Sequence, residues 1–225
     1  MLNYKLSTAM VFSVAVAGSF PAQAALMTYL GADNAVSSLA QMTNSQAAQA
    51  SFVAAAAAAN SPLTSITFEV PVPSGVGLSG GTITNNSGCG ALCGFNTTPG
   101  GQFFYLVVGG TATFTFSTPI DAFGMYITGL QTNLVPQETL TFNDGSTQII
   151  NTPAATGGGG AFMGLTDFGK NIVSVSYNAT NDIVSLDDVL FESTGSPSPA
   201  PEPASLAILA SALFGLGAIR ARRRT

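Results

Sequence analysis

Residues 111–117 read Thr-Ala-Thr-Phe-Thr-Phe-Ser, and this stretch decides the fold class. Apolar and hydroxyl side chains alternate at every position, so Ala112, Phe114 and Phe116 lie on one face of an extended chain. Strict alternation over this length predicts a strand that is buried on one side. The stretch therefore indicates a β-protein whose sheets are apolar on the face that covers the core.

The same two-residue period recurs on both sides of this stretch. Asp144-Gly145 separates two alternating runs and predicts a tight hairpin. We choose a jelly-roll-type β-sandwich of about eight or nine strands, since many short strands with Gly-rich turns favour a sandwich or barrel. In a jelly roll the first and last strands can pair. Besides 111–117, the expected strands are 64–70, 103–108, 123–128, 139–143, 147–150, 161–165, 173–177 and 183–192.

An Ala-rich segment precedes the strands. Residues 35–59 are dominated by alanine, the strongest helix former. Asp33 or Asn34 is placed to cap the start of a helix, and Pro62 would stop it. We therefore treat 25–62 as a helical lead-in and 63–194 as the sandwich domain, all-β apart from this one helix.

The charge balance excludes several classes of function. The chain has 6 Lys+Arg, 11 Asp+Glu and no His, and between residues 25 and 200 only Lys170 is cationic. Without His there is no Ser-His-Asp or Cys-His catalysis. One cation cannot neutralise a nucleic-acid backbone, and no Gly-rich loop leads into Lys-Ser/Thr, so we expect neither nucleic acid nor nucleotide as a partner. We predict that the protein is not an enzyme, with a two-carboxylate glycosidase as a distant third possibility.

The N-terminus has the pattern of a secretory signal. Within residues 1–24, Lys5 precedes an apolar run, which ends at Ala22-Gln23-Ala24. A positive start, an apolar stretch and a small-x-small site are the three parts of a signal peptide. We expect cleavage between Ala24 and Ala25 and export of the rest.

The C-terminus has the pattern of a membrane-sorting tail. Residues 195–225 begin with a Pro/Ser-rich linker, continue with Pro201-Glu202-Pro203, and contain a 16-residue apolar stretch at 204–219. A full transmembrane helix needs about 20 residues, so this stretch is short for a permanent span. The positive-inside rule places the basic end in the cytoplasm. The basic residues are Arg220, Arg222, Arg223 and Arg224.

This tail resembles the PEP-CTERM sorting tail of Gram-negative exported proteins, also named an ice-binding protein C-terminal motif. The resemblance implies that an exosortase cuts near Pro201-Glu202-Pro203 after a transient stay in the inner membrane. It further implies delivery to the cell surface or the exopolysaccharide matrix of a biofilm. An ordinary C-terminal membrane anchor is the alternative. The body, at 46–70 and 121–192, is similar to a module of the same proteins that implies a β-sandwich of carbohydrate-binding type.

Two adjacent carboxylates raise the question of a metal. Asp187 and Asp188 lie within an apolar strand pattern, so one of them must face apolar side chains. A buried carboxylate must be paired, ligated or protonated. We predict a structural Ca²⁺ held by Glu69, Asp187 or Asp188, and backbone carbonyls, because oxygen ligands without His or thiolate favour Ca²⁺. An equally weighted alternative is that the Asp sits at a strand end and accepts backbone N–H bonds.

The remaining candidates are two cysteines and two tyrosines. Cys89 and Cys93 are the only cysteines, and in an exported protein we expect them to form a disulfide. Tyr105 and Tyr126 are weak candidates for glycan contact, although a strand tyrosine more often packs in the core.

Two functions follow from these patterns. The first is a structural or adhesion protein of the biofilm matrix, with exopolysaccharide as a possible partner. The second is a Ca²⁺-dependent glycan-binding module.

Overall fold

The computed structural model describes residues 26–131, 137–167 and 172–192. The predicted signal peptide, its cleavage position, the linker, the Pro-Glu-Pro sequence and the sorting tail lie outside these residues, as does Lys170. Within the described residues, no helix is long and apolar enough to cross a membrane.

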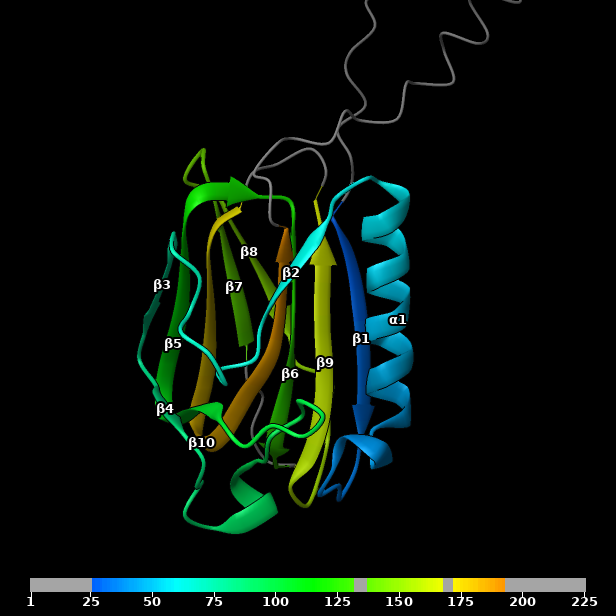
Figure 1. Cartoon of the computed structure of the whole chain (residues 1–225), viewed down its shortest axis with the longest axis vertical. Coiled ribbons are helices and arrows are strands. Elements are labelled where there is room, and N and C mark those ends of the chain that lie inside the picture. The colour runs from blue at the N-terminus through cyan, green and yellow to red at the C-terminus, as the bar shows by residue number, and fades with distance from the viewer. Residues whose placement is uncertain (1–25, 132–136, 168–171, 193–225) are drawn as a thin grey trace, which may run out of the picture. The chain divides into compact units, whose positions relative to one another are not determined.

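The described chain is mostly antiparallel β-structure with one α-helix (Figure 1). Two short 3-10 helices interrupt the loops. The elements in chain order are β1 (Met27–Asp33), η1 (Leu39–Gln41), α1 (Thr43–Ala58), β2 (Leu63–Ile66), β3 (Val76–Ser79), β4 (Thr82–Thr84), η2 (Gly90–Cys93), β5 (Phe104–Ile120), β6 (Ala122–Leu130), β7 (Gln137–Phe142), β8 (Thr147–Asn151), β9 (Gly159–Thr166) and β10 (Ile172–Glu192).

Two long strands run through both layers of the sandwich. The first part of β10 pairs with β7 and the second half of β5, and its last part pairs with β6, β2 and the first half of β5. β5 bends at Gly109-Gly110 and β10 bends near Thr180, all with positive φ. The bend in β10 is visible at the bottom of Figure 1. These bends let one hydrogen-bonded sheet curl into two facing layers.

The main core fills the space between the layers. Phe114, Phe123 and Leu186 are all completely buried there, and they come from three different strands. The alternating face of 111–117 points into this core, as the sequence predicts: Ala112 and Phe114 are 0% exposed and Phe116 is 8% exposed.

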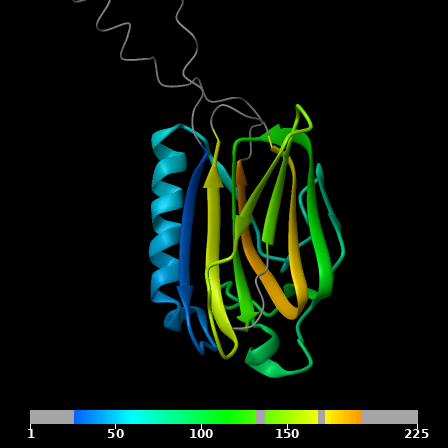
Figure 2. The same cartoon turned by 180° about the vertical axis from the view of Figure 1, so that it is seen from behind.

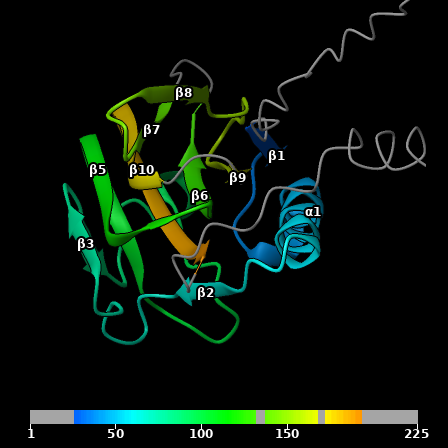
Figure 3. The same cartoon turned by 90° about the horizontal axis from the view of Figure 1, so that it is seen from above.

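A second, smaller core lies under α1. Figures 2 and 3 show the helix against the outer side of β1 and β9. Phe52 of α1 packs on Phe162 of β9, and the Phe162 ring in turn contacts Tyr126 of β6. Every residue of β6 and β9 is buried, because the main core covers one face of these strands and α1 covers part of the other. At Gly31 an added Cβ would lie 2.3 Å from the Asn44 carbonyl oxygen, so a side chain there would push the helix away.

A carboxylate from β1 caps the helix. Asp33 accepts hydrogen bonds from the backbone N–H groups of Asn44 (3.0 Å) and Ser45 (2.9 Å), and from the Ser45 hydroxyl (2.7 Å). Burial raises the pKa of Asp33, but the bonds from Ser45 and Asn44 outweigh burial, and the net pKa is lowered. The cap thus comes from eleven residues upstream and fixes the helix to the edge strand.

The β-sandwich and its single preceding helix confirm the predicted fold class, and so does the pairing of β2 with β10 as the first and last predicted strands.

The boundaries of several elements differ from the predicted ones. Residues 27–33 of the helical lead-in form a strand, and α1 begins at Thr43 rather than near 35. The runs 103–108 and 111–117 form one bent strand, as do 173–177 and 183–192. The strand predicted at 64–70 ends at Ile66, since Phe68 has φ of 61°. The short strands β3 and β4 are not among the predicted strands.

Candidate functional site

A polar hollow of about 440 Å³ is formed by the loop between β4 and β5. Side-chain amides from three parts of this loop open into it together with two phenylalanine rings, and none of the lining side chains is an acid or a base. We call this hollow the amide groove. It is lined by Ser37, Asn85, Asn86, Ser87, Gly90, Ala91, Gly94, Phe95, Asn96, Gly101, Gln102 and Phe104.

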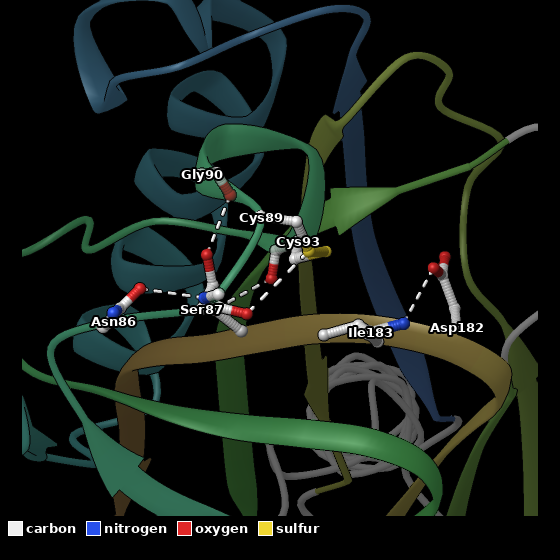
Figure 4. The surroundings of a disulfide bond; sticks show 9 residues. Asn86, Ser87, Cys89, Gly90, Cys93, Asp182 and Ile183 are labelled. Carbon is white, nitrogen blue, oxygen red and sulfur yellow. Dashed lines mark hydrogen bonds between the residues drawn. A yellow bond between two sulfur atoms is a disulfide. The ribbon is translucent and has the colours of Figure 1, made fainter.

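The predicted disulfide is present (Figure 4), and it lies in the same turn as Gly90 and Ala91 of the groove lining. Cys89 and Cys93 bracket η2, so the bridge holds a single helical turn closed. The Ser87 hydroxyl donates to the Gly90 carbonyl at 2.8 Å, and the Gly88 N–H donates to the Asn86 side chain at 2.9 Å. The cysteine prediction is confirmed, and the bond limits the movement of the residues that line the groove.

Glu69 holds another part of the same loop. Its Oε1 atom accepts hydrogen bonds from the backbone N–H groups of Gln102 (2.5 Å) and Phe103 (2.7 Å), and from the Asn96 amide (3.2 Å). The Asn96 amide also donates to the Phe103 carbonyl at 2.6 Å. One carboxylate oxygen therefore pins the two ends of segment 96–103 together.

Asp187 and Asp188 hold the same segment at Thr97 and Thr98. Asp187 is completely buried, and its Oδ2 atom accepts from the backbone N–H groups of Thr97 (2.6 Å) and Thr98 (3.2 Å). Asp188 accepts from the hydroxyls of Thr97 (3.1 Å) and Thr98 (2.7 Å). Asp188 has φ of 44° and lies where the β6–β10 register shifts, so both carboxylates reach the same loop. A regular strand would send them to opposite faces.

Burial dominates the electrostatics of Asp187. It raises the pKa of this carboxyl to about 7, although the bond from Thr97 acts in the opposite direction, and the negative charge of Asp188 raises the pKa further. Asp187 Oδ1 has no hydrogen-bond partner within the described residues. Asp187 is thus both the anchor of the loop and a group that protonates near neutral pH.

The three carboxylates predicted to bind Ca²⁺ all contact the loop that lines the groove. In the described residues no group of three or more His, Cys, Asp or Glu side chains is arranged to hold a metal. Asp187 accepts backbone N–H bonds from the loop, which is the alternative that the sequence left open, and Glu69 does the same. Asp188 accepts from the Thr98 hydroxyl instead. Calcium at these residues stays a prediction.

Close backbone contacts seat the loop on the sandwich. At Gly129, which has φ of +91°, an added Cβ would lie 2.6 Å from the Cys93 carbonyl carbon. At Gly94, with φ of +105°, it would lie 2.2 Å from the Ser185 hydroxyl oxygen. Next to these contacts, the Thr128 hydroxyl accepts from the Phe95 N–H at 2.9 Å. Glycine at these two places allows the loop to rest directly on β6 and β10.

The two tyrosines are not placed to contact a glycan, which corrects the prediction. Tyr105 is 3% exposed; its ring stacks on Phe68 and its hydroxyl accepts from the Gly81 N–H. Tyr126 is 1% exposed, lies under α1 and donates to the Gln49 side chain. Both rings serve as core packing with one satisfied polar atom, so neither face is open to a sugar.

The sequence analysis missed the residues that line the groove. Asn85, Asn86, Asn96 and Gln102 sit in a stretch rich in Gly, Ser and Thr, which reads as a loop. A group of amides around a disulfide in such a loop is the signal that was present.

No family model matches this chain, and no curated protein matches it. Among solved structures, carbohydrate-binding modules of family 29 are similar in fold. One, a complex with mannohexaose, is 11% identical and covers 63% of this chain and 98% of that chain, with a TM-score of 0.39. Another, a complex with cellulohexaose, is 11% identical and covers 63% and 97%, with a TM-score of 0.38. At this identity and TM-score, the similarity says nothing about a ligand or a binding site in this chain.

Proposed function

We propose that the protein is a non-catalytic glycan-binding protein that takes a neutral sugar chain in the amide groove. The observation that carries the proposal is the lining itself. Asn and Gln amides offer both donors and acceptors, which is what sugar hydroxyls require, and a volume of about 440 Å³ falls in the range of small-ligand sites.

Two amides are available to a ligand. The side chains of Asn85 and Gln102 make no hydrogen bond to the described protein, although both line the groove. In contrast, the amides of Asn86 and Asn96 support the loop. The preformed loop lowers the entropy cost of binding, since the disulfide and Glu69 already order it.

Charge favours a neutral glycan over an acidic one. Glu69, Asp187 and Asp188 hold the loop, and the described residues contain no Lys, Arg or His. A polysaccharide rich in carboxylates would meet a negative potential without a compensating cation.

We further propose that the chain is exported by its N-terminal signal and processed by an exosortase at its PEP-CTERM tail. Exopolysaccharide of the biofilm matrix is then the proposed partner. The support for this step is the order of signal, body, Pro-Glu-Pro, apolar stretch and terminal arginines in the sequence.

Co-sedimentation of the full chain with neutral and uronic-acid exopolysaccharides tests the proposal. We expect saturable binding to the neutral polymer, and a roughly 5- to 10-fold loss of affinity in Asn85→Ala or Gln102→Ala, since a net hydrogen bond contributes about 1 kcal/mol. Gln148→Ala is the matched control, because this exposed amide lies on β8 and outside the groove. Absence of saturable binding, or equal binding by all variants, would leave the structural matrix role as the function.

A further inference from the structure

The first strand of the described chain is paired along one edge only. β1 pairs with β9 over Met27–Asp33 without a register shift, and no other described strand pairs with it. Every second residue of an antiparallel strand points its N–H and C=O groups away from its partner. Apart from the ladder to β9, the backbone of β1 is bonded in the described chain only near its end, by the side chains of Asn44 and Ser45. The outer edge of β1 therefore offers backbone donors and acceptors to another strand.

This edge lacks the features that keep exposed strands from pairing. Natural proteins protect an edge with a very short strand, a charge, a proline or a bulge. β1 has seven residues, whereas β2, β3, β4 and β8, which also pair with a single strand, have three to five. Its one charged residue, Asp33, is bonded to the start of α1. Met27 and Leu30 are 54% and 43% exposed. A regular and apolar edge of this length is a template for a further strand.

The distribution of charge indicates which strand this edge takes. The described residues include many acids but no Lys, Arg or His, so two copies repel each other over most of their surface. Residues 26–68, which include β1 and α1, contain one acid, Asp33, and residues 159–166 of β9 contain none. Two copies can therefore meet on this side without bringing carboxylates together. A basic partner protein, in contrast, would be drawn to the acidic surface elsewhere.

We propose that the outer edge of β1 pairs with β1 of a second copy, so that the protein forms a two-fold symmetric dimer with one sheet continuous across the interface. Two antiparallel copies of one strand are self-complementary, since each supplies the same alternating donors and acceptors. Full overlap of Met27–Asp33 places Leu30 directly opposite the same residue of the second copy. These two exposed leucines then pack against each other as a cross-strand pair.

The position of α1 fits this arrangement. Phe52 contacts both Tyr29 of β1 and Phe162 of β9, so α1 lies over the two strands and leaves the outer edge open (Figure 3). Neighbouring strands are about 4.8 Å apart, so the axis of each helix would lie about one strand spacing from the two-fold axis. The two helices would then be about 9–10 Å apart, and packed helices are about 8–10 Å apart.

The side of α1 that would face the second helix carries only small side chains. The Tyr126 hydroxyl of β6 donates to Gln49, which marks the side of the helix toward the middle of the sheet. A helix turns by about 100° per residue, and this rotation gives the residues on the opposite side. They are Ala47, Ser51, Ala55 and Ala58. None of them is charged or larger than serine, so two helices can approach to this distance.

The proposed interface is small. A strand of seven residues and a helix of 16 residues each extend for about 24 Å. An interface that is one strand and one helix wide lies at the low end of specific interfaces, so we expect a micromolar Kd. Dimer formation does not depend on glycan binding. If the proposed function holds, the dimer carries two amide grooves, and bivalency raises the apparent affinity for a polymer.

Sedimentation velocity of the full chain in mild detergent, over a wide range of protein concentration, tests the dimer. We expect a reversible monomer–dimer equilibrium that NaCl strengthens, because salt screens the repulsion between acidic copies. Leu30→Glu and Ser51→Glu should each raise the dimer Kd by at least about 10-fold, since each places like charges near the two-fold axis. Two controls should leave the Kd unchanged: Ile149→Glu, which is equally exposed on the edge strand β8, and Val53→Glu, which is on the Gln49 side of α1.

Cross-linking gives a second readout that depends on a gained bond. Cys89 and Cys93 are bonded to each other, so a new cysteine is the only free thiol. With copper phenanthroline as the oxidant, Leu30→Cys should form a disulfide-linked dimer, because the two thiols lie opposite each other. Thr28→Cys is the matched control on the same strand. In the proposed register Thr28 lies opposite Ala32 of the second copy, so this variant should cross-link much more slowly.

Three results would overturn the proposal. A chain that stays monomeric at every concentration would leave the edge of β1 to a segment of this chain outside the described residues. Association that survives both Leu30→Glu and Ser51→Glu would assign the contact to another surface, such as the apolar tail. Cross-linking that is no faster in Leu30→Cys than in Thr28→Cys would exclude the symmetric register. Folding of each variant is checked by its near-ultraviolet spectrum and Tm at a concentration where the wild-type chain is monomeric.

Discussion

Three carboxylates hold the loop: Glu69, Asp187 and Asp188. Among their conservative substitutions, Asp187→Asn should change the pH dependence of stability the most. The wild-type carboxyl has a pKa near 3.8 when the chain is unfolded and about 7 when it is folded. Between these values the folded state holds a proton that the unfolded state lacks. The contribution of Asp187 to stability is therefore fully present below pH 4 and is lost as the pH rises toward 7.

The size of the effect follows from this difference. A pKa raised from 3.8 to about 7 corresponds to about 4 kcal/mol of lost stability across the window. An asparagine keeps a carbonyl oxygen for the N–H groups of Thr97 and Thr98 and carries no charge. The advantage of Asp187→Asn over wild type should therefore grow by about 4 kcal/mol from pH 4 to pH 8.

Urea denaturation in EDTA at pH 4 to 8 measures this difference, and a constant m-value would show that only stability has changed. Other buried acids such as Glu138 contribute equally to both proteins and cancel. Asp144→Asn is the control, since Asp144 is exposed in the β7–β8 turn. If Asp187→Asn follows the wild-type profile at every pH, Asp187 is ionised in the folded protein and the reasoning fails. If Ca²⁺ stabilises the wild-type protein relative to EDTA, and both Asp187→Asn and Glu69→Gln abolish this stabilisation, the result would instead support the calcium prediction at these residues.

Two further substitutions test the helix cap and the seat of the loop. Asp33→Ala should cost about 1–2 kcal/mol in thermal unfolding at pH 7, since it removes the cap of α1. Because the folded pKa of Asp33 is lowered, this difference is present above the unfolded value of 3.8 and should vanish as the pH falls through the folded value; a difference that persists at low pH would contradict the capping role. Gly129→Ala should displace the loop at Cys93 and weaken glycan binding, because the new Cβ would lie 2.6 Å from the backbone. Gly145→Ala in the β7–β8 turn carries the same positive-φ strain with nothing within 4 Å and lies outside the groove, so equal loss of binding in both would refute the role of close contact.

The main features of the fold follow from local patterns. The strand Thr111–Ser117 has a single apolar face, and this face, with its phenylalanines, packs against the core. The Asp144-Gly145 turn joins β7 and β8 in the predicted place. Cys89 and Cys93 are close enough in sequence that their pairing needs no knowledge of the rest of the chain.

Other features depend on contacts between distant segments. β1 is a strand because it pairs with β9, more than 120 residues later, and its own sequence has no strict alternation. The two long strands looked like four because their bends at Gly109 and Thr180 interrupt the period of two. β6 keeps its alternation in the sequence, but α1 covers part of its second face, so its burial on both faces does not follow from the pattern.

The candidate site divides in the same way. The sequence by itself determined that Asp187-Asp188 needs a partner, because a carboxylate in an apolar strand cannot stay unsatisfied. Which partner it has was decided by the tertiary structure: a bulge turns both aspartates toward Thr97 and Thr98, some ninety residues earlier. The sequence likewise determined an acidic, cation-poor body, whereas the pairing of Glu138 with Tyr177 depends on strand register. Register is set by the packing of whole strands, and no single segment carries that information.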